Sequence, residues 1–349
     1  MEKTTIKKES KRKIRVDFER APLRERLKSK FLNTFFLKKV LFLIFKLVLL
    51  VGVSYVILYP YITKIFGSFM SKSDFKDVTV ILISKNPSLD QYKYIITENH
   101  YFEALLTTFL ISASVALIQT LVCALVAYGL AKFKFKGNGL VFLIVILTLM
   151  IPYEMLKYPF LTYFSKFHES NPIGWVLYKL GLIKKGAMFN SVWPLYIMSI
   201  TGLGLKNGLF IFMLRQFFKG VPDELEESAY VDGSNTFKTF FSIILPISVP
   251  MLITVFVFAF AWQWTDDFFL SNGDTSIFFE ASYWGKEDSL KLISHISSIP
   301  PSLQNTKITN FENAIRGTAS ILIIIPLLIV YLFVQNKIVE GVERSGIIG

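Results

Sequence analysis

The chain has 349 residues and a formal net charge of +12, and 52% of its residues are hydrophobic, including 34 Phe; its mean hydropathy is +0.48. Charged residues make up 18% of the sequence, whereas soluble domains usually carry roughly 25%. This composition excludes an ordinary soluble protein and predicts a membrane protein.

The N-terminal segment, residues 1–39, is a basic tail that precedes every apolar run. Lys and Arg recur densely between Lys7 and Lys30, and such a cluster before a first span lies on the cytoplasmic side of a membrane. The tail leads straight into an apolar run, and no nucleic-acid-binding module surrounds it. We therefore expect it to contact membrane lipids and no nucleic acid.

Six apolar runs of roughly 20 to 26 residues follow, each long enough to cross a ~30 Å hydrocarbon core as a helix. They lack the period-two alternation of barrel strands, so the sequence predicts an all-α integral membrane protein with six transmembrane helices. An even number of spans places both termini in the cytoplasm, and the short basic loop 132–138 fits that orientation. The runs are approximately Val40–Ile62, Leu105–Leu130, Leu140–Tyr163, Val192–Phe217, Ile243–Trp264 and Ile315–Val334.

The fourth predicted span carries a charge at mid-membrane depth. Lys206 precedes Arg215 by nine residues, which places it roughly 13 Å from the inner interface at ~1.5 Å per residue. Such a residue usually faces a bundle interior or a watery cavity. The sequence predicts a translocation path that includes Gly204, Lys206 and Asn207; the alternative is a snorkelling or helix-paired lysine.

Trp264 and Asp266, at the outer end of the fifth span, are further candidates for this path. Aromatic rings stack on flat solute faces, but Trp at a membrane boundary is also typical of an interfacial belt. The polar loop that follows, residues 266–313, is long enough to have a function of its own.

Residues 222–250 read PDELEESAYVDGSNTFKTFFSIILPISVP and predict a helix, a sharp turn and a second helix. Pro222 suits a first helical turn, and the acids after it favour the positive end of the helix dipole. Gly233 ends this helix because glycine tolerates a left-handed cap, and Ser234 caps a second short helix through Phe240. The acids are Asp223, Glu224, Glu226 and Glu227.

The topology places this helix pair on the cytoplasmic side. Its apolar residues recur at helical intervals, so one face docks into the groove of a partner while the acids lie near the rim. An amphipathic loop that packs beneath its own bundle fits the same spacing. The apolar residues are Leu225, Ala229, Phe237, Phe240 and Phe241.

Catalytic and metal-binding signatures are missing from the sequence. Cys123 is the one cysteine, and the three histidines are isolated from one another. There is no HExxH or GxSxG motif, and GSNTFKT departs from a phosphate-binding loop because Phe237 replaces the second glycine. We predict no catalytic residue, no metal site and no cofactor in this chain.

Several motifs carry a resemblance to a known family. ESAYVDGS, which starts at Glu227, is followed by Leu245-Pro246 and is similar to an E-A-A-x-x-x-G signature with Ser228 at the central alanine. AYGLAKFKFKG, IPYEMLKYPFLTYF, LRQFFKGVPDELEE, WQWTDDFFL and QNKIVEGVERSGIIG also match in order. From about Phe102 onward, the chain resembles the permease subunits of binding-protein-dependent carbohydrate ABC importers of the maltose-transporter type.

This resemblance implies a type I ABC importer fold, a role as transporter subunit rather than enzyme, and several site residues. The cytoplasmic helix pair would dock on an ATP-hydrolysing subunit, with Glu227 making a charge-assisted contact and Gly233 permitting the turn. The implied ATPase-coupling residues are Glu224, Glu226, Glu227, Ser228, Ala229, Asp232, Gly233, Ser234 and Phe237. A C-terminal contact with the ATPases is implied for Glu343, Arg344, Ser345 and Gly346.

The resemblance also implies partners, location and domains. The partners are a second homologous permease, two ATP-binding cassette subunits that hold ATP and Mg, and an extracellular sugar-binding (lipo)protein, all at a bacterial plasma membrane. The expected segments are the tail 1–39, the first helix and outside loop 40–100, and the importer domain 101–342. The importer domain includes the coupling loop 219–245 and the outside loop 266–313, and residues 343–349 form a cytoplasmic tail.

Two alternatives remain open at this stage. The same importer class carries other solutes, such as a sugar phosphate or a glycerol-phosphate-like solute. A membrane enzyme acting on lipid-linked sugars is a different class and needs acids or histidines clustered at one interface, but the acids cluster only in the coupling loop.

Overall fold

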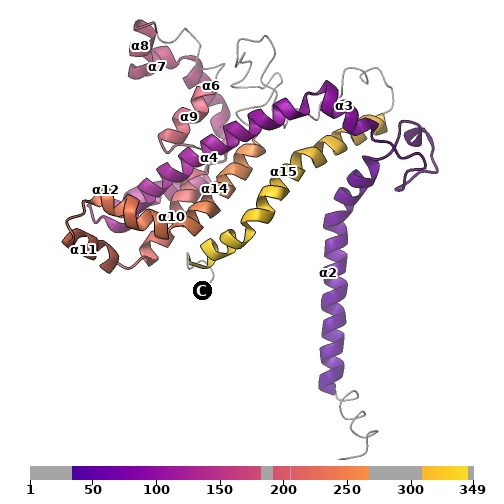
Figure 1. Cartoon of the computed structure of the whole chain (residues 1–349), viewed down its shortest axis with the longest axis horizontal. Helices are drawn as coiled ribbons and strands as arrows, with labels where there is room; N and C mark the ends of the chain where they lie inside the picture. Colours follow the sequence, from indigo (N-terminus) through magenta and orange to yellow (C-terminus); the bar gives the residue numbers. More distant parts are fainter. Residues whose placement is uncertain (1–33, 182–191, 205, 267–308, 345–349) are drawn as a thin grey trace, which may run out of the picture. The chain divides into compact units, whose positions relative to one another are not determined.

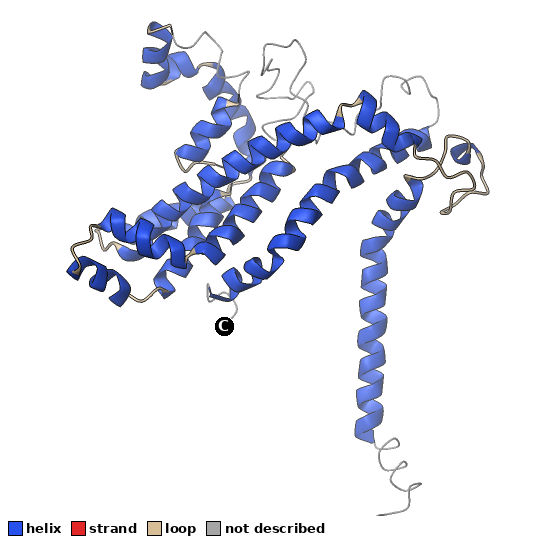
Figure 2. Cartoon of the chain, viewed as in Figure 1, coloured by secondary structure: helices blue, strands red, loops and turns tan. Residues whose placement is uncertain are grey.

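The structure is a computed structural model that describes residues 34–181, 192–204, 206–266 and 309–344. Within these ranges it consists of helices and loops without a strand (Figure 2), apart from one isolated bridge between Met70 and Pro87. Residues 1–62 and residues 63–349 form two compact units. Most of helix α2 (Thr34–Gly67), which contains the predicted span Val40–Ile62, belongs to the first unit.

The second unit is built around four helices. Helix α4 (Tyr101–Lys132) packs on α10 (Asn207–Gly220) and α14 (Val249–Trp264), and α14 also packs on α15 (Thr309–Arg344). Figure 1 shows α4, α14 and α15 running side by side. The face of α4 toward these neighbours is rich in fully buried alanines, which let helices approach closely: Ala104, Ala116, Ala124 and Ala127.

Three of the six predicted spans are confirmed as unbroken helices. By length and composition, the described residues contain three helices able to cross a membrane, located within α2, α4 and α15. A fourth is counted only if a bent helix pair is treated as one span. The prediction of six continuous transmembrane helices is therefore not confirmed by these criteria.

The third and fourth predicted spans are interrupted. Helix α5 (Asn138–Met150) ends where Ile151 turns extended before Pro152, because a residue that precedes proline disfavours the α conformation. The chain resumes as η2 (Tyr153–Leu156) and α6 (Lys157–Ser165). The fourth span splits into α9 (Trp193–Ile200) and α10 across a turn in which Gly202 is left-handed.

The fifth predicted span begins later than expected. The segments Thr236–Ile247 and Val249–Trp264 meet at an angle of 80°. The first contains α12 (Thr236–Thr239), a π-helical turn η3 (Phe240–Ile244) and the short α13 (Leu245–Ile247). Pro246 and Pro250 lie on either side of the bend and remove backbone donors, which explains why the helix does not run straight from Ile243.

The segment between the first two spans folds compactly on the start of α15. It contains η1 (Asp74–Lys76) and α3 (Asp90–Glu98). Gln91 Nε2 donates to the carbonyls of Gly67 and Met70, each at 2.8 Å, and its Oε1 accepts from Thr318 Oγ1 at 2.7 Å. Further along the chain, α7 (Phe167–Ser170) and α8 (Pro172–Lys179) pack on each other after α6.

Candidate functional sites: the coupling unit and the helix-break pocket

The predicted helix, turn and second helix are confirmed; we call residues 222–241 the coupling unit. Helix α11 (Glu224–Val231) has three acids in its first turn. It ends in a double hydrogen-bonded cap, because Gly233 N donates to Tyr230 O at 3.0 Å and Ser234 N donates to Ala229 O at 2.9 Å. Gly233 has a φ of 79°, the left-handed conformation that the sequence predicts for it.

The second helix of the coupling unit is capped by Asn235, whereas the sequence analysis assigned this role to Ser234. Asn235 Oδ1 accepts from Lys238 N at 2.8 Å. The Ser234 backbone N–H closes the cap of α11, and the N-cap of the second helix is the next residue along the chain.

A buried ion pair fixes α11 to the end of α4. Lys132 Nζ lies 3.2 Å from Glu226 Oε1, and the two side chains are 7% and 9% exposed. Tyr128, one turn before Lys132, donates from its hydroxyl to Glu226 Oε2 at 3.0 Å. Lys132 Nζ also donates to Val221 O at 2.6 Å and to Asp223 Oδ1 at 2.5 Å. We call Tyr128, Lys132, Asp223 and Glu226 the anchor network.

The anchor network changes the role that the sequence analysis gave to Glu226. That residue was predicted to contact the ATPase, but the structure directs its carboxylate inward, onto α4. Sequence reasoning missed Lys132 and Tyr128 altogether. Their one signal was the spacing of a Tyr and a Lys on the same face of a helix that ends at a predicted membrane boundary.

The ion pair between Lys132 and the exposed side chain of Asp223 adds to the contact between α4 and α11. The hydrogen bond from Lys132, together with its charge, holds the pKa of the Asp223 carboxyl below its usual range. Asp223 therefore remains ionised at neutral pH and keeps its bond to Lys132.

Aromatic packing lies beneath the anchor network. The ring of Tyr128 is 4.9 Å from that of Phe240 and 5.9 Å from that of Phe218, measured between centroids. Phe218 on α10 and Phe240 in η3 are both buried. The coupling unit consequently rests on a cluster that joins α4, α10 and η3.

The outer face of the coupling unit is exposed and partly apolar. Val231 is 87% exposed and Phe237 is 71% exposed. Glu227 is exposed as well, and the described residues provide no ion pair or hydrogen bond for its carboxylate. The sequence analysis placed Ala229 and Phe240 on the apolar docking face. The structure corrects this part of the prediction, because both side chains are buried inside the chain.

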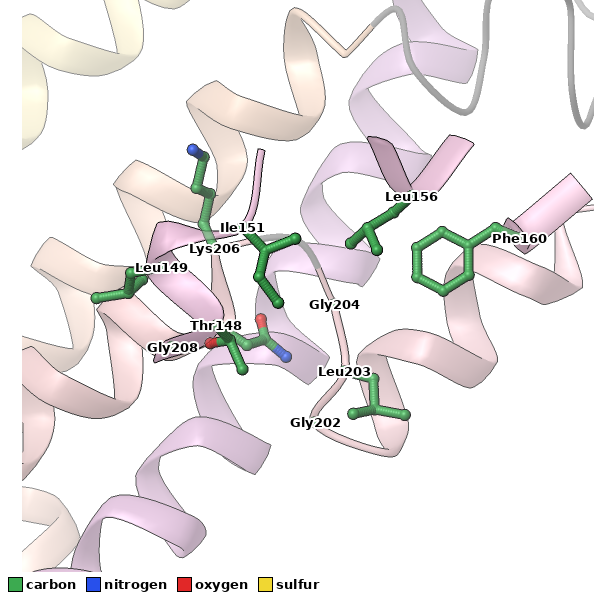
Figure 3. Close-up of a pocket in the computed structure, with 11 residues that line it drawn as sticks. Thr148, Leu149, Ile151, Leu156, Phe160, Gly202, Leu203, Gly204, Lys206 and Gly208 are labelled. Atoms are coloured by element: carbon green, nitrogen blue, oxygen red, sulfur yellow. The ribbon is translucent and has the colours of Figure 1, made fainter. Parts of the chain in front are cut away.

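A second candidate site lies where the third and fourth spans are broken; we call it the helix-break pocket. Its volume is about 240 Å³ (Figure 3). One side comes from the end of α5, with Thr148 and Ile151, and the other from the turn before α10. The sequence-predicted path residues Gly204, Lys206 and Asn207 all line it.

Lys206 has an unusual backbone conformation at the edge of this pocket. Its φ is 66°, a left-handed value that is uncommon for a residue with a side chain. Its Nζ lies 4.4 Å from the ring centroid of Trp262 on α14, within the range of a cation–π interaction. Trp262 therefore contacts one of the predicted path residues.

Two buried amides near the pocket have unused hydrogen-bonding groups. Asn207 on α10 is 2% exposed and Gln119 on α4 is 1% exposed. Neither side chain has a hydrogen-bond partner for its oxygen or its nitrogen in the described part of the chain. A Cβ atom placed on Gly204 would meet both side chains, so both amides lie against the broken turn.

Trp264 and Asp266 do not line the pocket, which corrects their assignment to the path. Trp264 is 2% exposed and donates from Nε1 to Ile323 O on α15 at 3.0 Å, as a core residue does. Asp266 is also buried. Of the predicted C-terminal contacts, Glu343 and Arg344 belong to the last turn of α15, whereas Ser345 and Gly346 lie outside the described residues. Residues 267–308, most of the predicted outside loop 266–313, also lie outside them.

Comparison with known proteins shows which family this chain belongs to. The model of the "binding-protein-dependent transport system inner membrane component" family matches residues 119–344. The chain is 25% identical over 295 residues to the polygalacturonan/rhamnogalacturonan transport system permease protein YtcP of Bacillus subtilis, covering 83% of this chain and 92% of the relative. It is 23% identical over 300 residues to the arabinooligosaccharides transport system permease protein AraQ of Halalkalibacterium halodurans, covering 85% and 93%.

A solved structure supports the fold. A chain of a bacterial ABC transporter involved in the import of the acidic polysaccharide alginate superposes with a TM-score of 0.61 at 18% identity, covering 86% of this chain and 97% of that one. The fold predicted from the sequence, a helical importer permease, is confirmed. The family model covers well over half of the chain, including the coupling unit and the helix-break pocket. This chain belongs to the family of inner membrane components of binding-protein-dependent transport systems.

Proposed function

We propose that this chain is the transmembrane permease subunit of an ATP-driven importer that moves a sugar or oligosaccharide into the cytoplasm after delivery by an extracellular binding protein. Family membership makes it a membrane transport subunit rather than an enzyme. The relatives named above are permease proteins of transport systems for polygalacturonan/rhamnogalacturonan and for arabinooligosaccharides, which supports a carbohydrate solute. The single observation that carries the proposal is a coupling unit with a solvent-exposed partner face and a fixed inner face.

The proposed assembly contains a second, homologous permease, two ATP-binding cassette subunits that bind ATP and Mg, and an extracellular sugar-binding lipoprotein. Val231 and Phe237 support a partner at the coupling unit, since large apolar side chains at this exposure gain free energy when they are covered. The location that fits is a bacterial plasma membrane with both termini in the cytoplasm, in agreement with the basic tail. The last turn of α15, with Glu343 and Arg344, supplies a second contact to the ATPases.

The anchor network gives the coupling unit a mechanical role in this proposal. An ATPase that moves α11 also moves the end of α4, because Glu226, Lys132 and Tyr128 join the two helices through buried charge-assisted bonds. Helix α4 in turn packs on α10 and α14. ATP-driven movement is thereby delivered to α10, whose first residues line the helix-break pocket.

The helix-break pocket provides the proposed contact with the solute. The unused amide groups of Asn207 and Gln119 can donate to and accept from hydroxyl groups, which a sugar presents at high density. Buried polar groups of this kind cost free energy unless a water or a solute satisfies them. A sugar phosphate is the second candidate solute, favoured by the ammonium group of Lys206 at the pocket edge.

The test is co-purification followed by transport. We would tag the chain, extract it from its native membrane in mild detergent, and measure vanadate-sensitive ATP hydrolysis in the eluate for wild type, Glu227→Ala and the distant control Glu103→Ala. Loss of ATPase in Glu227→Ala alone would support the coupling face. Well-folded wild-type protein that brings no ATPase with it would overturn the proposal.

Uptake of the solute identifies the cargo. Cells with the intact importer should accumulate labelled oligosaccharide, and Asn207→Ala should reduce that uptake without releasing the ATPase. Competition by a sugar phosphate but not by neutral sugars would favour the second candidate.

A further inference from the structure

The loop between α4 and α5 forms a shallow open groove of about 540 Å³. We call it the basic groove. It contains three cationic side chains, Lys134, Lys136 and Arg215, together with Phe133, Phe135 and Asn138, and none of its lining residues is acidic. It is separate from the helix-break pocket, with which it shares no lining residue.

Arg215 lines the basic groove and is held in place by neutral groups. Its Nε donates to Leu130 O at 3.1 Å, and its guanidinium carbon lies 3.7 Å from the ring centroid of Phe142. The residue is only 9% exposed, and the described residues place no carboxylate within ion-pair distance of it. Buried charges are normally paired with a counter-charge, so an anion from outside the chain is the missing partner.

The two lysines extend the positive charge to the rim. In the described part of the chain, neither Lys134 nor Lys136 makes a hydrogen bond or an ion pair. Lys134 acts electrostatically on Asp223, but the pKa of Asp223 is lowered chiefly by its bond to Lys132 and least by Lys134. The acid is thus already engaged with Lys132.

Apolar side chains alternate with these cations and continue along α5. Phe133 and Phe135 are 43% and 47% exposed. In α5, Leu140, Leu143 and Ile144 are each more than half exposed. An inorganic phosphate would leave this surface uncovered, whereas a phospholipid places its phosphate among the cations and its acyl chains on the apolar side chains.

We propose that the basic groove binds the headgroup phosphate of an anionic phospholipid, with the acyl chains along α5. The site lies at the end of α4 from which Lys132 reaches the coupling unit, so a bound lipid would order the loop next to the anchor network. This inference does not depend on which solute the importer carries.

The test uses the intact importer and phosphatidylglycerol with short acyl chains, with phosphatidylcholine of the same length as the neutral comparison. Binding is measured by native mass spectrometry for wild type, Lys134→Gln/Lys136→Gln and the control Lys72→Gln/Lys93→Gln, which removes the same charge at exposed positions that line neither the groove nor the coupling unit. Each basic residue near an anionic headgroup adds to the electrostatic attraction. Loss of both lysines should therefore weaken the binding of phosphatidylglycerol by roughly tenfold or more. The control should bind like wild type.

Three results would overturn the inference. Equal binding by the groove variant and the control would show that the groove is not the site. Displacement of the lipid by inorganic phosphate at the same concentration would assign the groove to a soluble anion. Crosslinking of Lys136→Cys to an ATPase subunit would show that protein covers the groove. The vanadate-sensitive ATPase activity of each variant shows whether the importer has assembled. Failure of the lipid-binding inference can therefore be distinguished from failure of the proposed importer function.

Discussion

At the scale of single residues, the pairing of Lys132 with Glu226 is the most informative contact in the molecule. Both side chains are more than nine-tenths buried, and they join segments far apart in the sequence. A buried pair of this kind contributes little compared with an apolar pair of the same shape, but removing one partner leaves an uncompensated charge. Loss of either residue should therefore weaken the attachment of α11 to α4.

Lys132→Met should destabilise the attachment of α11 by about 3–5 kcal/mol, because Glu226 then remains buried without its cation. The measurement is limited proteolysis of the coupling unit together with the thermal stability of the importer. Lys132→Met/Glu226→Leu should recover most of the loss, since both charges are then gone. The surface control Lys219→Met should match wild type, and a single variant as stable as that control would contradict the pairing.

Asp223 gives the anchor network a defined response to acid. Its pKa is lowered in the folded protein by Lys132, so its contribution to stability is complete above the ordinary aspartate pKa of about 4. That contribution is lost as the pH falls through the lowered folded-state value. Thermal stability of wild type and Asp223→Asn should therefore differ by a constant amount between neutral pH and about pH 5 and converge in stronger acid. A difference that vanished already near neutral pH would count against the Lys132 bond.

At the scale of elements, the turn that ends α11 decides where the exposed face of the coupling unit points. Gly233 has a left-handed backbone conformation, and its N–H and that of Ser234 donate the two hydrogen bonds that close the end of α11. A residue with a branched side chain adopts this conformation at a cost of about 1–2 kcal/mol.

Gly233→Val should uncouple ATP hydrolysis from uptake while leaving membrane insertion unchanged. Gly233→Asn is the matched control, because asparagine tolerates the left-handed conformation. Uptake and ATPase activity are measured in the same membranes. Normal uptake in the valine variant would argue that the turn has no part in coupling.

The contact between α5 and α10 is set by another glycine. A Cβ atom on Gly208 would lie 2.9 Å from Val145 O and close to Thr148. Gly208→Val should therefore push α5 away from α10, lower stability by about 1–3 kcal/mol and reduce uptake. Gly220→Val is the control, since open space surrounds that position on the same helix. Equal thermal stability of the two variants would refute the close approach.

The elements also show what the sequence could predict and what it could not. The spans in α2, α4 and α15 were predictable because they are long and uninterrupted. Hydropathy averages over a window, so it counted Pro152 and Gly202 as minor interruptions although the helices end beside them. The helix pair 222–241 was predictable from local caps, but the anchor network depends on a contact between distant segments that no local pattern encodes.

At the scale of the whole molecule, the chain combines the helix-break pocket with the coupling unit. The fold of importer permeases is shown by the family match and by the alginate-importer superposition. The pocket residues Gly204, Lys206 and Asn207 were predictable because charge and glycine are unusual in an apolar segment. Trp264 was misassigned because a buried tryptophan that bonds to a neighbouring helix has the same sequence signature as one that lines a pore.

The interrupted helices have a consequence for the life of the protein in the cell. Where α5 and α9 stop, the ladder of helical hydrogen bonds is broken within the predicted third and fourth spans, and hydrocarbon cannot hydrogen-bond any backbone group that such a break leaves without a partner. Only water in a pathway or a neighbouring protein can satisfy such groups. A copy whose helix breaks are covered by neither is therefore poorly solvated by the bilayer, and we expect membrane proteases to remove it faster than a covered copy.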